Sequence, residues 1–279
     1  WEAVGFHRPL AGELWEVILE LINNALYIFT ITLLIPLLEP FPEINGYKNI
    51  GWGLFVFIYT IFDTGTNFGL NRFISEYRIR NPRKMMEYVN FFIRYQMITG
   101  LMQVTVLSYW IFEVLVNGQY VYLMWILLLH MQKQYPGMLG IFKSVLSGMQ
   151  YHGMVKIMNW VQGRGIEMIF NIAIILYGRY YGETHPEMGI LFAMAIFGVI
   201  GNYIDDIIML FVSGYYLNKV LKNYIGFSLI ESLNFKVGRD VYQNALRYGI
   251  PGSIVPIISS TIGAYMLVMR STEIGGFIT

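Results

Sequence analysis

Long apolar stretches alternate with short polar connectors along the whole chain. A helix needs about 20 apolar residues to cross the hydrocarbon core of a bilayer, and several stretches of the 279-residue chain reach that length. They cover residues 14–38, 50–70, 88–115, 119–146, 156–177, 188–212 and 248–269. Buried helices of soluble proteins are usually shorter than this. The pattern therefore predicts an all-α, polytopic membrane protein with about seven transmembrane helices.

The connectors carry turn residues and, in two places, an amphipathic pattern. Asn117-Gly118 predicts a tight turn before the fourth helix, and Pro136 predicts a break within that helix. Residues 72–88 and 217–246 mix large apolar side chains with charges of both signs. Such segments usually lie in the membrane interface, but we favour the interpretation that each is a solvated helix that anchors the bundle.

Composition narrows the possible functions. The chain is 56% hydrophobic and 13% charged, whereas soluble domains carry about 25% charged residues. The net charge of +1 gives no basic excess for nucleic acid. With no cysteine, disulfides, thiolate catalysis and cysteine-based metal sites are excluded. The sequence also has no phosphate-binding loop, paired-histidine zinc motif or nucleophile elbow, and we therefore expect no enzymatic activity, metal or cofactor.

The placement of lysine and arginine predicts the orientation. Positive residues collect in the short cytoplasmic loops of membrane proteins. In the seven-helix arrangement, 14 of the 19 lysines and arginines fall on one side, and only Lys48, Arg179 and Arg270 fall on the other. Lys133 and Arg164 lie within predicted helices. We therefore expect a multi-pass protein of the cytoplasmic membrane with its N-terminus in the cytoplasm.

Several ionisable residues fall at similar depths within the predicted helices. A helix rises about 1.5 Å per residue, which places Asp63, Lys133 and Arg164 together in the inner half of the membrane. Glu167 follows Arg164 by three residues, a spacing at which the two side chains can pair. Charges inside a bilayer are costly and mark functional sites by default. The pattern predicts a polar cavity that opens to the cytoplasm, although ion pairs that hold the bundle together would also explain these residues. Arg94 and Asp205 fall nearer the cytoplasmic boundary.

Three motifs resemble a known family of transporters. Residues 62–76, Phe-Asp-Thr-Gly-Thr-Asn-Phe-Gly-Leu-Asn-Arg-Phe-Ile-Ser-Glu, resemble the second-helix signature of the polysaccharide-biosynthesis flippases. Residues 146–152, Leu-Ser-Gly-Met-Gln-Tyr-His, are similar to the Gly-x-Gln turn after their fourth helix. Residues 245–251, Ala-Leu-Arg-Tyr-Gly-Ile-Pro, look like the opening of their seventh helix. These lipid-linked oligosaccharide flippases belong to the multidrug/oligosaccharidyl-lipid/polysaccharide exporter superfamily, whose members are MATE-like.

The resemblance implies a fold and a transport activity. Family members have two six-helix bundles that face a central cavity, and they flip a lipid-linked oligosaccharide or polysaccharide precursor across the membrane by alternating access. It follows that residues 1–216 would form the first six-helix bundle, 217–246 a cytoplasmic linker and 247–279 the truncated start of the second bundle. The expected partners are membrane lipid, the lipid-linked sugar and H⁺ or Na⁺.

The same resemblance suggests roles for the buried charges. Cationic residues in such cavities bind the diphosphate of the substrate, and the chemistry assigns this substrate-binding role to Lys133, Arg164 and Arg94. The acidic residues would pair with these cations or couple ions, and they are Asp63, Glu167 and Asp205.

Two alternatives to the flippase remain open. A cation-coupled drug antiporter of the same superfamily would use Asp63 to carry the proton or Na⁺. A non-transporting membrane subunit of a larger complex would use its amphipathic segments to dock partner proteins.

Overall fold

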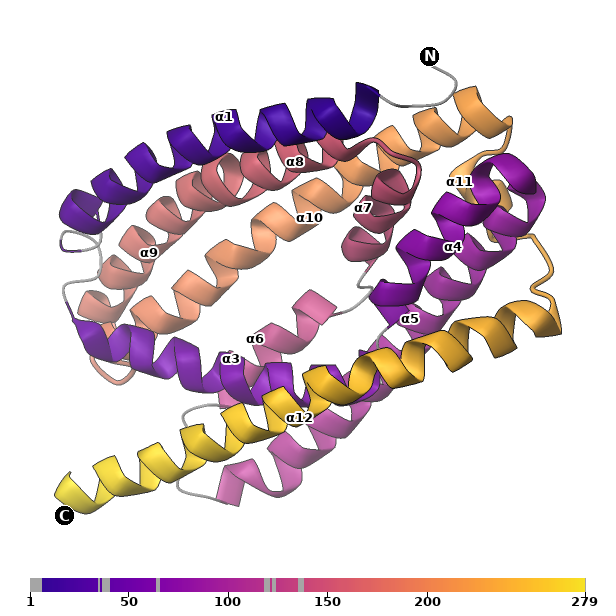
Figure 1. The fold of residues 1–279 in the computed structure, drawn as a ribbon. Helices are drawn as coiled ribbons and strands as arrows, with labels where there is room; N and C mark the ends of the chain where they lie inside the picture. Colours follow the sequence, from indigo (N-terminus) through magenta and orange to yellow (C-terminus); the bar gives the residue numbers. More distant parts are fainter. Residues whose placement is uncertain are drawn as a thin grey trace.

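The computed structural model describes residues 7–34, 36, 41–63, 66–117, 121, 124–134 and 138–278. Long helices run side by side in this part of the chain (Figure 1), and every regular element in it is helical. The all-α fold class is therefore confirmed. In chain order the elements are α1 (His7–Phe29), η1 (Thr30–Leu34), α3 (Pro42–Asp63), α4 (Thr66–Arg80), α5 (Pro82–Glu113), η2 (Leu115–Asn117), α6 (Met124–Gln134), α7 (Met138–Gly148), α8 (His152–Trp160), η4 (Val161–Ile166), α9 (Glu167–Thr184), α10 (Ile190–Ile225), α11 (Leu229–Ser232) and α12 (Arg239–Ile278).

Two helical segments of the described residues are long and apolar enough to cross a membrane: Pro82–Asn117 and Ile190–Ile225. This finding agrees weakly with a membrane protein, while the seven-span topology stays a prediction. The first segment also exposes a continuous apolar stripe at helical spacing, as do α10 and α12 over shorter stretches. On α5 the stripe consists of Ile98, Leu101, Met102, Val106, Tyr109 and Phe112.

Two predicted spans are each described as two helices. The second was expected over residues 50–70, where α3 runs to Asp63 and α4 from Thr66, with residues 64 and 65 outside the described part of the chain. The helix α4 then runs to Arg80 and takes up much of the predicted amphipathic connector at 72–88. In the fourth span, α6 runs to Gln134 and α7 from Met138, and the break predicted at Pro136 lies outside the described residues.

The predicted linker at 217–246 is largely helical. The helix α10 begins after Gly189, whose φ is +75°, and continues to Ile225, well past the predicted end at residue 212. Gly226 stops it in the left-handed conformation that favours glycine at a helix C-terminus. A capping box between Ser228 and Glu231 begins the short helix α11, and α12 starts at Arg239. The non-helical connector is therefore short.

Helices α9 and α10 form a tightly packed antiparallel hairpin. A Cβ at Gly182 would lie 2.7 Å from the Cα of Ile190, and a Cβ at Gly178 would lie 2.6 Å from the Cβ of Phe197. Small residues at such positions let helix backbones approach closely, as is common between membrane helices. This hairpin fixes the position of α10 relative to the η4 segment, which precedes α9 directly.

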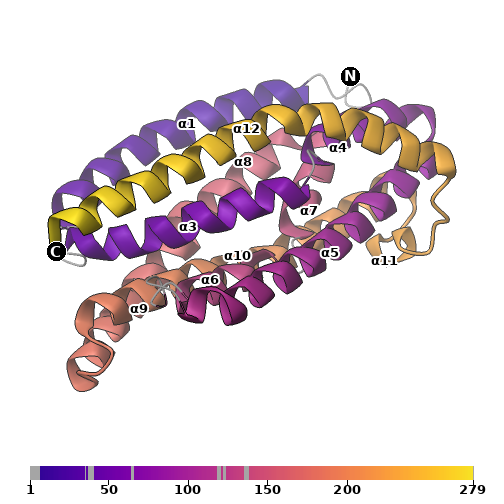
Figure 2. The same cartoon turned by 90° about the horizontal axis from the view of Figure 1, so that it is seen from below.

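The helix α12 packs along α3, α4 and α5, and Figure 2 shows it on the same side of the bundle as α3. Both Pro251 and Pro256 lie inside this helix. Its exposed side carries large apolar side chains over several turns: Ile250, Ile254, Val255, Ile258 and Ile262. Such an apolar face, with no packing partner in this part of the chain, is typical of a surface that contacts lipid or another helix.

Candidate functional site

A widened helical segment lies at the centre of the candidate site. Helices α8 and α9 form one continuous rod, but the segment η4 between them, Val161–Ile166, has π-helical hydrogen bonding. Two glycines, Gly163 and Gly165, flank Arg164 in this segment. Short π segments within α-helices occur frequently at functional sites. The segment also carries Arg164, one of the residues that the sequence placed in the inner half of the membrane.

On one side of η4, a single amide connects charges from two other helices. The Nε2 atom of Gln162 donates to Oδ2 of Asp205 and to Oδ1 of Asp206, each at 2.7 Å. The Oε1 atom of Gln162 accepts a hydrogen bond from Nζ of Lys143 in α7. Asp205 is 3% exposed, so its charge is stabilised by these contacts rather than by water.

This cluster was only partly predicted. Asp205 was among the residues expected to pair or couple ions, whereas Gln162 and Lys143 were not among the predicted site residues. Lys143 lies within α7 and reaches Gln162. Residues 146 and 147 lie one helical turn after Lys143 and therefore share its face of the helix. Because that face points into the bundle, this spacing could have identified Lys143 as a residue of the site.

The other side of the rod borders a polar groove of about 260 Å³ between α1 and α8–η4. Lys156 forms an ion pair across the groove with Glu16 of α1. Arg164 lies in the same groove with Glu20. The groove therefore contains side chains of both signs, an arrangement that can bind an ion or the polar head of a larger ligand. The residues that line it are Glu16, Leu19, Glu20, Asn23, Lys156, Asn159, Trp160, Gly163 and Arg164.

The other predicted site residues are distributed as follows. The backbone of Asp63 ends α3 and that of Lys133 lies in the last turn of α6, but the two side chains lie outside the described residues. The Oε2 atom of Glu167 lies 3.6 Å from the position that a Cβ would take at Gly163. Its carboxylate is thus directed toward the η4 segment. Glu167 and Arg164 therefore belong to the same short stretch of helix.

Arg94 contacts a different part of the molecule. Its Nη2 atom donates to the carbonyl of Leu233 at 2.8 Å, and its Nε atom donates to Oδ1 of Asn90 at 2.8 Å. Asn90 also donates to the carbonyl of Phe235 at 2.6 Å. Arg94 therefore holds the connector between α10 and α12 and does not line the groove that contains Arg164.

The three motifs quoted from the sequence meet at one end of the bundle. Arg72 of the first lies over the ring of Tyr248 of the third, 4.3 Å from its centroid. The hydroxyl of Ser75 donates to the carbonyl of Gly148, in the second motif, at 3.1 Å. Arg78 donates to the carbonyl of Met149 at 3.3 Å. Sequence segments far apart along the chain thus form one contact region around α4.

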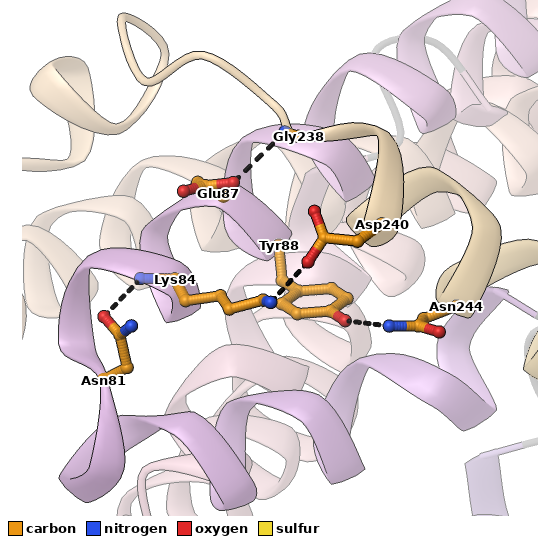
Figure 3. A network of polar contacts seen from close by, with 7 residues as sticks. All are labelled: Asn81, Lys84, Glu87, Tyr88, Gly238, Asp240 and Asn244. Atoms are coloured by element: carbon orange, nitrogen blue, oxygen red, sulfur yellow. Dashed lines mark hydrogen bonds and ion pairs between the residues drawn. The ribbon is translucent and has the colours of Figure 1, made fainter.

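Polar contacts next to this region hold the start of α12 on α5 (Figure 3). Lys84 forms an ion pair with Asp240, and the backbone N–H of Gly238 donates to Oε2 of Glu87 at 3.1 Å. The hydrogen bond from Lys84 holds the pKa of the Asp240 carboxyl below its usual range. Asn244 reaches the hydroxyl of Tyr88. These contacts connect the predicted second bundle to the first.

Comparisons with known proteins identify no relative of this chain. No family model, no curated protein and no solved structure matches it. The resemblance of the three motifs to the flippases therefore stays an expectation. Functional assignment rests on the chemistry of the η4 cluster, the groove beside it and the apolar outer faces of the helices.

Proposed function

We propose that this chain belongs to a multi-pass membrane transporter that moves an anionic, lipid-linked sugar across the cytoplasmic membrane by alternating access. The observation that carries the proposal is the η4 segment. It directs Arg164 into a polar groove on one side and, through Gln162, holds the carboxylates of the buried Asp205 and the partly buried Asp206 on the other. Charged residues inside apolar membrane helices are costly and usually functional, whereas a soluble helical protein does not require such a charged layer.

The outer surface supports a membrane location. The exposed faces of α5, α10 and α12 are apolar over several turns, and soluble monomers rarely expose contiguous apolar patches of that extent. Phe211 on α10 and Val255 on α12 are both 73% exposed. The proposal extends this membrane contact to all seven apolar stretches, with the N-terminus in the cytoplasm.

Arg164 is the central residue of the proposed substrate site. A guanidinium presents several donors in a fixed plane and matches the oxygens of a phosphate group. In this site it would bind the diphosphate of the substrate together with Lys133, whose helix ends near the same predicted depth. Arg94 is proposed to act indirectly, through the connector that it holds. Glu20 and Glu167 would pair with Arg164 when the groove is empty.

The buried carboxylates are proposed to couple transport to H⁺ or Na⁺. Protonation of Asp205 would remove a charged acceptor from Gln162, and the amide and Lys143 would then rearrange. Because these residues lie on α7, η4 and α10, that change would act on three helices at once. The same carboxylate pair favours a second candidate function, a cation-coupled drug antiporter, in which Asp205 or Asp63 would bind the cation.

Transport by the reconstituted protein tests the leading proposal. We expect Arg164→Ala and Lys133→Ala each to reduce flipping of a lipid-linked diphosphate sugar by roughly 10-fold or more, because each loses a charge-assisted hydrogen bond. The matched control is Arg179→Ala, which removes an exposed arginine that pairs only locally with Glu183 on α9. Unchanged transport in both site variants would refute the substrate site.

Binding of an organic cation separates the two candidate functions. The probe is tetraphenylphosphonium, and the variants are Asp205→Asn and Asp63→Asn. Saturable binding that either variant abolishes, together with no flipping of the sugar lipid, would favour the antiporter. Flipping that depends on Arg164 without cation binding would favour the flippase.

A further inference from the structure

Helices α1 and α8 lie side by side and run in the same direction (Figure 1). From α1, the groove between them is lined by Glu16, Glu20 and Asn23, whose spacing of four and three residues places them on one face of the helix. In the predicted topology both helices begin at the cytoplasmic boundary. The ion pair between Glu16 and Lys156 therefore lies at the cytoplasmic end of the groove, and Arg164 lies deeper in the membrane.

The wide turn of η4 helps to bring Lys156 and Arg164 onto the same side of the rod. Arg164 follows Lys156 by eight residues, which in a regular α-helix corresponds to about 80° around the axis and roughly 12 Å along it. The π-helical turn takes up an extra residue in one rotation, so it reduces this angle. Both side chains line the same groove. A ligand that enters from the cytoplasmic end thus meets two cations in succession.

The first of these cations is held by an ion pair that a ligand can reach. The side chains of Glu16 and Lys156 are 41% and 39% exposed, and exposed ion pairs contribute little to stability. A diphosphate group carries more negative charge and more acceptor oxygens than the single carboxylate of Glu16. It therefore forms the stronger charge-assisted hydrogen bonds with Lys156, and it can displace the carboxylate.

Opening of this ion pair would act on the position of α1. In the described part of the chain α1 packs mainly on α8. Its opposite face is exposed and apolar, with Leu14, Ile18 and Leu21 pointing away from the groove. Such a face can stay in contact with lipid while the helix moves. The contact between Glu16 and Lys156 is therefore a polar link that holds α1 over the groove.

We propose that the ion pair between Glu16 and Lys156 is a gate that the diphosphate of a lipid-linked substrate opens. Lys156 leaves Glu16 to bind the incoming diphosphate, α1 moves from the mouth of the groove, and the headgroup passes on to Arg164. When the groove empties, Glu16 pairs with Lys156 again and closes it. The gate rests on the proposed transport function, and it adds Lys156 as the first cation that the substrate meets.

Binding of a polyprenyl diphosphate to the purified protein in detergent tests the gate without requiring transport. Glu16→Gln removes the carboxylate that competes for Lys156 and should tighten binding roughly 2- to 5-fold, the worth of an exposed ion pair. Lys156→Gln removes the first cation and should weaken binding roughly 3- to 10-fold. Either variant breaks the pair, so a purely structural role would change binding in the same direction in both or in neither. That result would overturn the gate.

The double variant distinguishes the gate from simple repulsion between Glu16 and the ligand. In the Lys156→Gln background, Glu16→Gln should have no further effect, because no cation is left to release. A gain equal to that in the wild-type background would overturn the gate. The matched control is the ion pair between Arg179 and Glu183, whose side chains are 47% and 49% exposed and lie outside the groove. Arg179→Gln and Glu183→Gln should leave binding unchanged.

Inorganic pyrophosphate, as a second probe, identifies the source of the phosphate. Binding much weaker than that of the polyprenyl diphosphate supports a lipid-linked ligand. Equal affinity for the two probes would overturn that assignment in favour of a soluble anion.

Transport by the same variants separates the gate from the proposed function. If Arg164→Ala abolishes flipping while Glu16→Gln and Lys156→Gln bind like the wild type, the function stands and the gate is wrong. If those two variants shift binding in opposite directions while Arg164→Ala flips normally, the gate stands and the substrate site at Arg164 is wrong.

Discussion

The guanidinium of Arg72 lies 4.3 Å from the centre of the Tyr248 ring and connects α4 to α12. The ring of Phe73 packs against the same tyrosine with its centroid 6.0 Å away. Tyr248 lies near the start of the last predicted span. This contact therefore couples the predicted first bundle to the beginning of the second, at the end of the molecule where the polar contacts of Figure 3 also lie.

Loss of the Tyr248 ring should loosen α12 from α4. A cation–π contact is worth about 0.5–1 kcal/mol at an exposed site, and Tyr248 is partly exposed. We expect Tyr248→Leu to lower the stability by about that amount and Tyr248→Phe to have little effect, because phenylalanine keeps the ring. Thermal unfolding in detergent measures the difference. Tyr265→Leu, further along α12, is the control, and an equal loss there would contradict the assignment.

The ion pair between Lys84 and Asp240 should make the attachment of α12 sensitive to acid. The pKa of Asp240 is lowered in the folded protein, so its contribution is present above the unfolded value of about 3.9 and is lost as pH falls through the folded value. The Asp240 side chain is 55% exposed, and solvent screening keeps the effect small.

Unfolding midpoints measured from pH 6 downward check this dependence. The wild type should lose stability below about pH 4 more steeply than Asp240→Asn, which has no carboxyl to protonate at this position. Parallel curves for the two proteins would show that the pair does not contribute.

Removal of the Gln162 amide should destabilise the buried carboxylates. Gln162→Leu leaves Asp205 and Asp206 without this donor, and an unsatisfied buried group costs about 1–3 kcal/mol. Asp205→Asn in the same background should recover part of the loss, since it removes one of the buried charges. Chemical unfolding of the single and double variants gives the coupling energy. Additive effects would show that the hydrogen bond from Gln162 to Asp205 contributes nothing to stability.

The glycine contacts of the α9–α10 hairpin give a prediction with a matched control. Gly182→Ala places a methyl 2.7 Å from the backbone of Ile190, and such overpacking typically costs about 1–3 kcal/mol. Gly140→Ala, in the first turn of α7, meets nothing within 4 Å and should stabilise the protein by about 0.4–1 kcal/mol, because alanine lowers the conformational entropy of the unfolded chain. Thermal unfolding should therefore move in opposite directions for the two variants.

The apolar pattern predicted the helices better than it predicted their ends. Each apolar stretch corresponds to helix where the structure describes it, because helical periodicity is a local property of the sequence. The extension of α10 to Ile225 was not predicted, because polar residues such as Lys219 and Lys222 marked its last turns as a connector. Helix propensity and packing on α7 outweighed that signal.

The site was predictable in its depth but not in its contacts. Spacing along a helix placed Asp63, Lys133 and Arg164 at similar levels and Asp205 nearer the cytoplasmic boundary, yet it carried no information on which face each residue occupies. Arg94 shows the consequence: the resemblance suggested a role in the substrate site, whereas its side chain binds the connector at Leu233. The π-helical geometry of η4 has no simple sequence pattern beyond its two glycines. The pairing of Gln162 with Asp205 depends on that geometry and was not foreseen.

The η4 segment also sets how many residues the rod can hold while its two halves keep their directions. A π turn contains one residue more than an α turn, yet both complete one rotation around the helix axis. Deleting Gly165 would therefore let η4 close to an ordinary α turn, and α9 would keep Gly178 and Gly182 against α10. The backbone around Arg164 would lose its wide turn instead. A deletion elsewhere in α8 or α9 has no such turn to absorb it and would rotate the helix that follows by about 100°.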